Sequence, residues 1–213
     1  MPLKAFAFNC TLKLSPAESS TEKLLREMID ALREHEVEGD LVRAVDFNIK
    51  PGVKSDEGSG DDWPALRKRV VAADILLLGS PIWLGQPSSV AKRVLERMDA
   101  FLGEKDERGR MPSYGKVAVA VVVGNEDGAH HVAAEFQQAL TEVGFTIPAG
   151  GATYWVGEAM QSTDYKDLKE RSKVVTEWTK MLASNTAHLA NLLRQKNYPG
   201  RKPNQRQRTG KSK

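Results

Sequence analysis

The sequence predicts an α/β fold in which helices cover both faces of a five-stranded parallel sheet. Strand-like and helix-like segments alternate five times along 213 residues, and this alternation is typical of a parallel sheet with two helix layers. Two strand-like runs, residues 75–78 and 116–123, are almost continuously apolar, as strands buried on both faces require. Five strands in a chain of this length favour the three-layer order 2-1-3-4-5, with strands one, three and four at the centre.

The first half of the chain supplies three strands and two helices. A capping box, Ser19 to Glu22, precedes the first helical pattern, because a serine N-cap followed three residues later by glutamate satisfies free N–H groups at a helix start. The expected elements are a strand over residues 3–8, a helix over 20–35, a strand over 40–46, a helix over 62–72 and the strand that begins near Asp74.

The second half supplies two more strands and three helices. Apolar residues at helical spacing predict each helix, and Trp178 falls on the last of these stripes, so we expect it in the core. Pro148 has no N–H to donate, which suits the end of a short fifth strand. The expected elements are a helix over residues 88–101, a strand over 116–123, a helix over 129–143, a strand over 145–147 and a helix over 165–193, with loops at 103–114 and 150–161.

The composition excludes several classes of protein. With 40% apolar and 28% charged residues, the chain is an ordinary globular protein. Its longest apolar run, residues 117–123, is far shorter than the ~20 residues that cross a bilayer. The amino terminus has no signal-peptide pattern, so we expect a cytoplasmic location. The single cysteine, Cys10, cannot form a disulfide or hold a cysteine-bound cluster within one chain.

The positive net charge belongs to the end of the chain. Eight of the 31 Lys and Arg residues lie within residues 194–213, which hold no acid, so the rest of the chain has 23 basic against 28 acidic residues. We therefore expect one domain over residues 1–197 and a basic disordered tail over 198–213. A short charged tail is usually only solvated, and we expect no nucleic-acid partner and no membrane span.

Three loops leave the carboxyl ends of the central strands, where ligands bind in open α/β sheets. They cover residues 9–20, 80–87 and 124–131. The first ends in a helix start with three hydroxyl residues, which is either an anion site suited to phosphate or only a well-capped helix. Neither a Walker motif nor a G-x-G-x-x-G fingerprint is present, so a nucleoside triphosphate or Rossmann dinucleotide site is not supported.

Two segments of the chain resemble a known family. SPIWLGQPSSVAKRVLERMD and GNEDGAHHVAAEFQQALTEVGFTIPAGGATYWVGEA are similar to the NADPH-dependent FMN reductase and flavodoxin-like NAD(P)H oxidoreductase family, and the resemblance covers about residues 3–185. It implies a three-layer flavodoxin-like fold with FMN at the carboxyl edge of the sheet. By position, the residues implied to hold the FMN phosphate are Thr11, Lys13, Ser19, Ser20 and Thr21. Those implied to contact the flavin ring are Pro81, Ile82, Trp83, Leu84, Gly85 and Gln86, with Gly124, Asn125, Asp127 and Gly128 along its other edge.

The resemblance also implies a reaction. Hydride would pass from NADPH or NADH to FMN, and electrons would then reach a small acceptor such as a flavin or a quinone. The cofactor supplies this chemistry, so no protein catalytic residue is expected. A homodimer or homotetramer is implied as well. The alternative is a flavodoxin-like FMN electron carrier without substrate turnover of its own. A phosphoacceptor receiver module is disfavoured because strand three ends in Gly79-Ser80 rather than in aspartate.

Two pairs of residues near these loops have competing interpretations. His130 and His131 adjoin acidic residues, but neighbouring helix positions face different directions, so we expect no metal. Tyr154 and Trp155 either cover the flavin of a neighbouring subunit or cap the core of their own chain.

Overall fold

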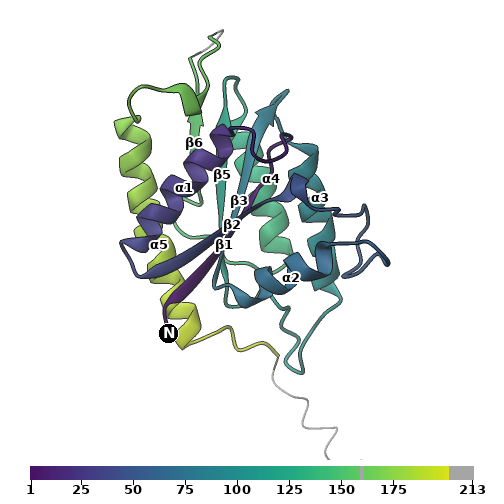
Figure 1. Ribbon diagram of the computed structural model, residues 1–213. Coiled ribbons are helices and arrows are strands. Elements are labelled where there is room, and N and C mark those ends of the chain that lie inside the picture. Colours follow the sequence, from purple (N-terminus) through teal and green to yellow (C-terminus); the bar gives the residue numbers. More distant parts are fainter. Residues whose placement is uncertain (159–160, 202–213) are drawn as a thin grey trace, which may run out of the picture.

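The computed structural model describes residues 1–158 and 161–201 and has three layers, with one sheet between two layers of helices (Figure 1). The parallel strands lie in the order β2-β1-β3-β5-β6, which is the predicted order 2-1-3-4-5 when only parallel strands are counted. Their bounds are Leu3–Asn9 for β1, Val37–Arg43 for β2, Ile75–Trp83 for β3, Val117–Gly124 for β5 and Ala152–Val156 for β6. A two-residue strand, β4 (Gln86–Pro87), pairs antiparallel with β3.

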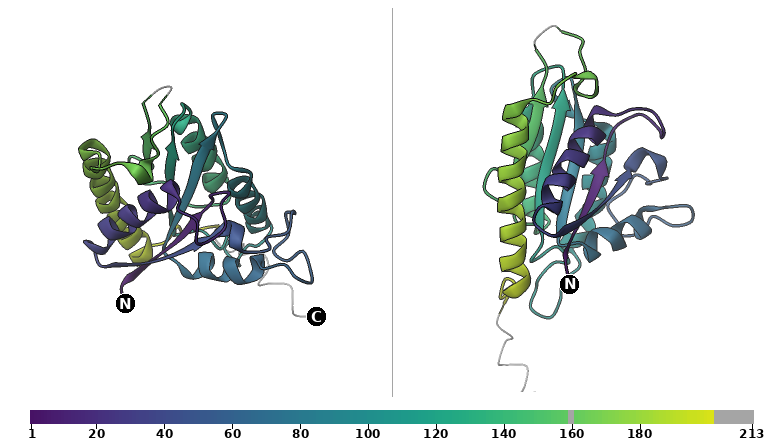
Figure 2. Two further views of the ribbon diagram at one scale, coloured as in Figure 1. Left: turned by 45° about the horizontal axis from the view of Figure 1, so that its top comes forward. Right: turned by 60° about the vertical axis from the view of Figure 1, so that its left-hand side comes forward.

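Two helices cover one face of the sheet and three cover the other (Figure 2). The first pair is α1 (Ser20–Arg33) and α5 (Lys173–Gln195), and the others are α2 (Trp63–Ala72), α3 (Ser89–Met98) and α4 (Ala129–Glu142). Alternate side chains of β1 divide between the layers, since Ala5 and Ala7 belong to the core with α1 and α5, whereas Phe6 and Phe8 belong to the core with α2. This is the alternation of a strand that is buried on both faces.

The central strand β3 confirms the strongest sequence pattern. Its residues 75–78 are no more than 1% exposed, because β1 and β5 flank the strand and helices cover both its faces. Fully burying each such aliphatic side chain contributes roughly 1.5–3 kcal/mol relative to exposure. The prediction that residues 75–78 lie at the centre of the sheet is therefore correct.

The predicted capping box at α1 forms in one direction only. Ser19 is the N-cap, and its Oγ accepts the N–H of Glu22 at 3.2 Å. The Glu22 carboxylate instead accepts hydrogen bonds from the side chains of Arg26 and Arg43. The helix also ends at Arg33 rather than at the predicted His35.

Two strands differ from the prediction. β2 begins three residues earlier than expected, and residues 44–46 form a 3₁₀ turn. The segment predicted as strand five, residues 145–147, makes one bridge, between Thr146 and Val117. Pro148 follows directly and has no N–H with which to extend that pairing. The fifth strand is β6, within a segment predicted as a loop, and its run of Thr153, Tyr154, Trp155 and Val156 has the β-branched and aromatic side chains that strands favour.

The last helix starts later than predicted. Residues 165–167 form a 3₁₀ turn, and α5 begins at Lys173 with Ser172 as its N-cap. Trp178, expected in the core, is 38% exposed and donates from Nε1 to the carbonyl of Ala152 at 2.8 Å. The inner face of α5 carries small side chains such as Ala183 and Ala187, which let the helix lie close to the sheet and leave the indole at its side.

Among the described residues, no helix is both long and apolar enough to span a membrane. The predicted tail over residues 198–213 lies outside the described residues from position 202 onward.

Candidate functional site

A hollow of about 450 Å³ opens where β1, β3 and β5 end, and we call it the carboxyl-edge hollow. Its size lies within the ~300–1,000 Å³ typical of small-molecule sites. Its walls come from the three loops that the sequence singles out, together with Asp164 from the segment before α5. Parallel strands bring these loops to one edge because all their carboxyl ends point the same way.

Eleven of the fifteen residues expected to bind the cofactor line this hollow. They are Thr11, Lys13, Ser19, Ser20, Thr21, Pro81, Ile82, Trp83, Leu84, Gly124 and Asn125. The other four do not line it, namely Gly85, Gln86, Asp127 and Gly128. The hollow also has four lining residues that the sequence did not indicate, namely Leu12, Val123, Glu126 and Asp164.

One end of the hollow is rich in hydrogen-bond donors. The Thr11 hydroxyl oxygen accepts the N–H of Lys13, and the Ser20 hydroxyl oxygen accepts the N–H of Lys166, so each hydroxyl keeps its proton for another acceptor. The N–H groups of Ser20 and Thr21 lie in the first turn of α1, where no intrahelical acceptor exists. This donor set, at the positive end of a helix, fits a phosphate group.

Asn9, at the end of β1, is hydrogen-bonded to residues next to this donor-rich end. Its side chain is fully buried, its Oδ1 accepts the N–H of Thr11 at 3.2 Å, and its Nδ2 donates to Glu22 at 3.3 Å. A strand-terminal asparagine next to a polar loop is the sequence signal that would have identified it.

The other end of the hollow is formed by a hairpin within residues 80–87, where the sequence predicted a loop. β3 continues through Pro81 and Ile82 to Trp83, and β4 returns antiparallel beside it. The two turn residues, Leu84 and Gly85, have φ of 53° and 73°, which is the geometry of a tight two-residue hairpin. Leucine at such a position gives no sequence signal, which explains the incorrect prediction.

The base of the hairpin is tied to the start of α3. Ser88 donates its N–H to the Ser80 hydroxyl at 2.9 Å and its own hydroxyl to the Cys10 carbonyl at 2.6 Å. Its Oγ also caps α3 by accepting the N–H of Ala91. These bonds fix the hairpin against β1, while Trp83 remains 53% exposed and Leu84 91% exposed at the mouth.

The loop after β5 closes the third side. Glu126 accepts the N–H of Leu84 at 2.7 Å, which joins this loop to the tip of the hairpin. Asn125 donates to the Asp164 carboxylate at 2.9 Å. Gly128 lies so close to Gly85 that an added Cβ would be 2.7 Å from the Gly85 Cα. Gly85 and Gly128 therefore do not line the hollow, but their close contact lets the hairpin pack against the loop after β5.

The two histidines face different partners. His130 makes a 2.8 Å hydrogen bond with the Tyr154 hydroxyl, and His131 lies 3.2 Å from Gln86 and 2.9 Å from Glu135. In the part of the chain that the structure describes, no three His, Cys, Asp or Glu side chains are grouped as metal ligands. Trp155 packs against Tyr165 with ring centroids 5.3 Å apart, so it covers the core of its own chain.

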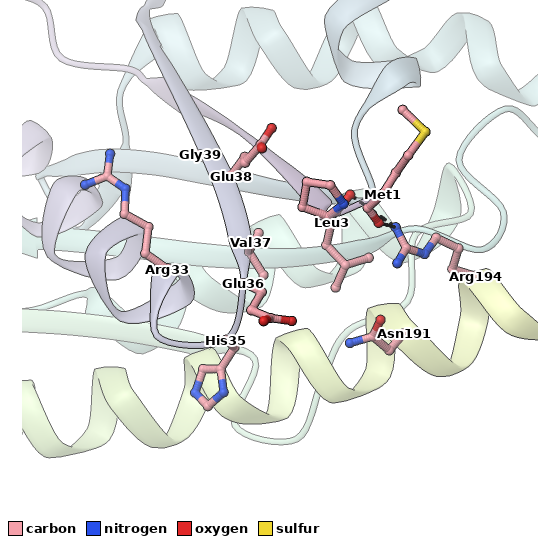
Figure 3. Close-up of a pocket in the computed structure, with 11 residues that line it drawn as sticks. Met1, Leu3, Arg33, His35, Glu36, Val37, Glu38, Gly39, Asn191 and Arg194 are labelled. Carbon is pink, nitrogen blue, oxygen red and sulfur yellow. Dashed lines mark hydrogen bonds between the residues drawn. The ribbon is translucent and has the colours of Figure 1, made fainter.

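A second hollow, about 840 Å³, lies at the opposite edge of the sheet, where β1 and β2 begin (Figure 3). Arg33 and Arg194 lie on opposite sides of it and do not point toward a common centre. Arg33 pairs with Asp30, and Arg194 donates to the Met1 and Pro2 carbonyls. Despite its larger volume, this hollow lacks the convergent donors that a ligand site needs.

Comparison with known proteins identifies the family to which this chain is similar. A sequence model of the family described as NADPH-dependent FMN reductase matches residues 3–161. The 8-demethyl-8-aminoriboflavin-5'-phosphate synthase of Streptomyces davaonensis is 32% identical over 208 residues, which cover 93% of this chain and 81% of that protein. The crystal structure of RosB with the bound intermediate 8-demethyl-8-formylriboflavin-5'-phosphate superposes with a TM-score of 0.84 at 32% identity, over 92% of this chain and 82% of RosB.

A further relative matches over only part of its length. The divalent metal cation transporter MntH of Mycobacterium bovis is 39% identical over 199 residues, which are 90% of this chain but 29% of that protein. The chain thus spans less than a third of this relative. Because the family model matches residues 3–161 and the synthase is 32% identical over most of both chains, the chain belongs to the NADPH-dependent FMN reductase family.

Proposed function

We propose that the chain is an FMN-dependent NAD(P)H oxidoreductase that reduces a small acceptor such as a flavin or a quinone. The observation that carries the proposal is the division of the carboxyl-edge hollow into a donor-rich end at α1 and an apolar, aromatic end at the β3–β4 hairpin. A flavin mononucleotide has the matching division into a phosphate and a planar ring. Bound FMN would accept hydride from a nicotinamide and pass electrons to the acceptor.

The residues of the chain would bind and orient this cofactor. The hydroxyl groups of Thr11 and Ser20 would donate hydrogen bonds to the phosphate, and exposed Lys13 would add a positive charge beside it. Ile82 and Trp83 would form an apolar wall along one side of the ring. Asn125 is held by Asp164 and would present polar atoms to the ring's opposite edge.

Turnover with a nicotinamide tests the proposal. We expect purified protein to bind one FMN per chain, and we expect NADPH or NADH to bleach the flavin absorbance under anaerobic conditions. Addition of a quinone should restore the absorbance through many cycles. Recovery of FAD instead of FMN would contradict the cofactor assignment, and bleaching too slow to sustain turnover would favour an electron carrier.

Substitution at the hairpin tests the placement of the ring. Trp83→Ala removes an aromatic contact worth ~1 kcal/mol beyond its burial, so FMN affinity should fall by roughly tenfold. Fluorescence titration of the flavin-stripped chain measures the effect. Trp178→Ala is the matched control, because that indole is partly exposed but lies away from the hollow. Equal affinities for the parent and Trp83→Ala would mean that the ring lies elsewhere.

We propose a homodimer or homotetramer with the mouth of the hollow near the interface. Three of the side chains that line the hollow are exposed and apolar, namely Leu12, Trp83 and Leu84, and such patches mark interaction surfaces. Light scattering at micromolar concentration should give at least twice the chain mass of 23.5 kDa. A single species at the chain mass would refute the proposal.

A further inference from the structure

We propose that Arg43 is a positioning residue, which fixes residues 13–18 in the shape that receives the phosphate of the flavin. The inference rests on the proposed function, because it assigns a role next to the phosphate end of the same hollow. Arg43 does not line that hollow. It ends β2, the strand beside β1, so its side chain reaches under the loop from a neighbouring strand.

One guanidinium holds the loop by its backbone. The Arg43 side chain is 6% exposed, and its Nη1 donates to three carbonyls of the same loop. These belong to Lys13 at 3.1 Å, Leu14 at 2.9 Å and Ala17 at 2.8 Å. A planar guanidinium makes several such bonds in fixed directions, so these carbonyls are held together around one buried point.

Those bonds matter for an anion because carbonyl oxygens repel it. Neither Leu14 nor Ala17 lines the hollow, and both of their carbonyls point to the buried guanidinium. In a trans peptide the next N–H points away from the carbonyl. Arg43 therefore keeps the negative ends of three peptide dipoles away from the place where a phosphate would lie.

Arg43 also neutralises an acid beside the phosphate end. Its Nη2 donates to Glu22 at 2.5 Å, and Glu22 lies in the first turn of α1. Burial acts to raise the pKa of Glu22, but hydrogen bonds from Arg43 and Arg26, together with their charges, outweigh it and hold the pKa below its usual value. The carboxylate is thus ionised, and without Arg43 its charge would oppose an incoming phosphate.

Comparing FMN with riboflavin isolates this role, because riboflavin lacks only the phosphate. The full chain, stripped of flavin, is titrated with each ligand for the parent, Arg43→Met and Arg43→Lys. Since charge-assisted hydrogen bonds are the strong ones, we expect Arg43→Met to weaken FMN binding by at least about tenfold and riboflavin binding by less than about twofold. Arg43→Lys keeps the charge but not the planar, forked guanidinium, so its FMN affinity should lie between those of the parent and Arg43→Met. It replaces Arg43→Met in the test if that variant does not fold.

Arg194→Met is the matched control. Arg194 also donates from Nη1 to backbone carbonyls, but at the opposite edge of the sheet, so its loss should leave the ratio of the two affinities unchanged. If folded Arg43 variants keep the parent ratio, the inference is wrong while the proposed function stands. If the parent itself binds both ligands equally well, the phosphate is not held at α1, and the proposed placement of the cofactor fails together with the inference.

Discussion

Arg97→Met should destabilise the protein by about 3–5 kcal/mol, because it leaves a buried carboxylate without its counter-charge. The side chains of Arg97 and Asp61 are both fully buried, with Nη2 and Oδ2 2.8 Å apart. Arg97 also donates to the Lys50 carbonyl at 2.9 Å, and its guanidinium lies 5.8 Å from the centre of the Trp63 ring. The pair joins α3 to the long loop between β2 and α2. Urea unfolding of the parent and of Arg97→Met measures the difference in their free energies of unfolding.

The pH dependence of stability tests the same pair. Burial acts to raise the pKa of Asp61, but hydrogen bonds from the Glu57 and Trp63 N–H groups, from Arg97 and from the Lys50 N–H outweigh it, so the pKa lies below its ordinary value. A carboxyl whose pKa is lowered by folding adds stability that is fully present above its unfolded pKa, about 4, and is lost as the pH falls through the folded value. Below about pH 4, stability should therefore fall less steeply in Arg97→Met than in the parent.

A surface pair provides the control for this prediction. Arg33 and Asp30 are 62% and 57% exposed, and exposed pairs contribute about 0–1 kcal/mol. Arg33→Met should therefore leave the urea midpoint nearly unchanged. An Arg97→Met protein as stable as Arg33→Met would show that the buried pair contributes nothing beyond what an apolar side chain supplies.

The fold was predictable where one physical effect dominates. Residues 75–78 and 117–123 are apolar enough that only a central strand buries them, and Ser19 has the chemistry of an N-cap. The fifth strand was missed because β6 lies at an edge, where one side of the strand is unpaired and three of its five residues are only partly buried. Such a strand does not show the continuous apolar run that marks the centre.

The site was predictable in its loops but not in the groups that hold them. Strand order alone places residues 11–21, 81–84 and 124–125 at one edge. Arg43 contacts Glu22 across 21 positions of the chain, and Arg97 contacts Asp61 across 36. A charged residue in a sequence normally indicates a solvated surface, and only the folded chain shows that these two arginines are enclosed by their partners.

Gly128→Ala should weaken FMN binding by at least about tenfold, because it forces the hairpin away from the loop after β5. Gly128 has a φ of 126°, which side chains other than glycine rarely adopt, and such strain costs about 1–3 kcal/mol. The added Cβ would also lie 2.7 Å from the Gly85 Cα and 2.8 Å from its carbonyl oxygen. These are backbone atoms and cannot rotate aside, so overpacking adds about 1–3 kcal/mol unless the Leu84–Gly85 turn moves.

Gly85→Ala separates the collision from the strain. Gly85 also has a positive φ, 73°, but a Cβ there meets nothing closer than the Asp127 carbonyl at 3.9 Å. Its cost should be limited to about 1–2 kcal/mol of backbone strain, with a smaller change in FMN affinity than Gly128→Ala. Flavin titration and thermal melting of the two variants measure both quantities. Equal FMN affinities for Gly128→Ala and the parent would mean that the Leu84–Gly85 turn can move without weakening FMN binding. The contact between the two turns would then not shape the hollow.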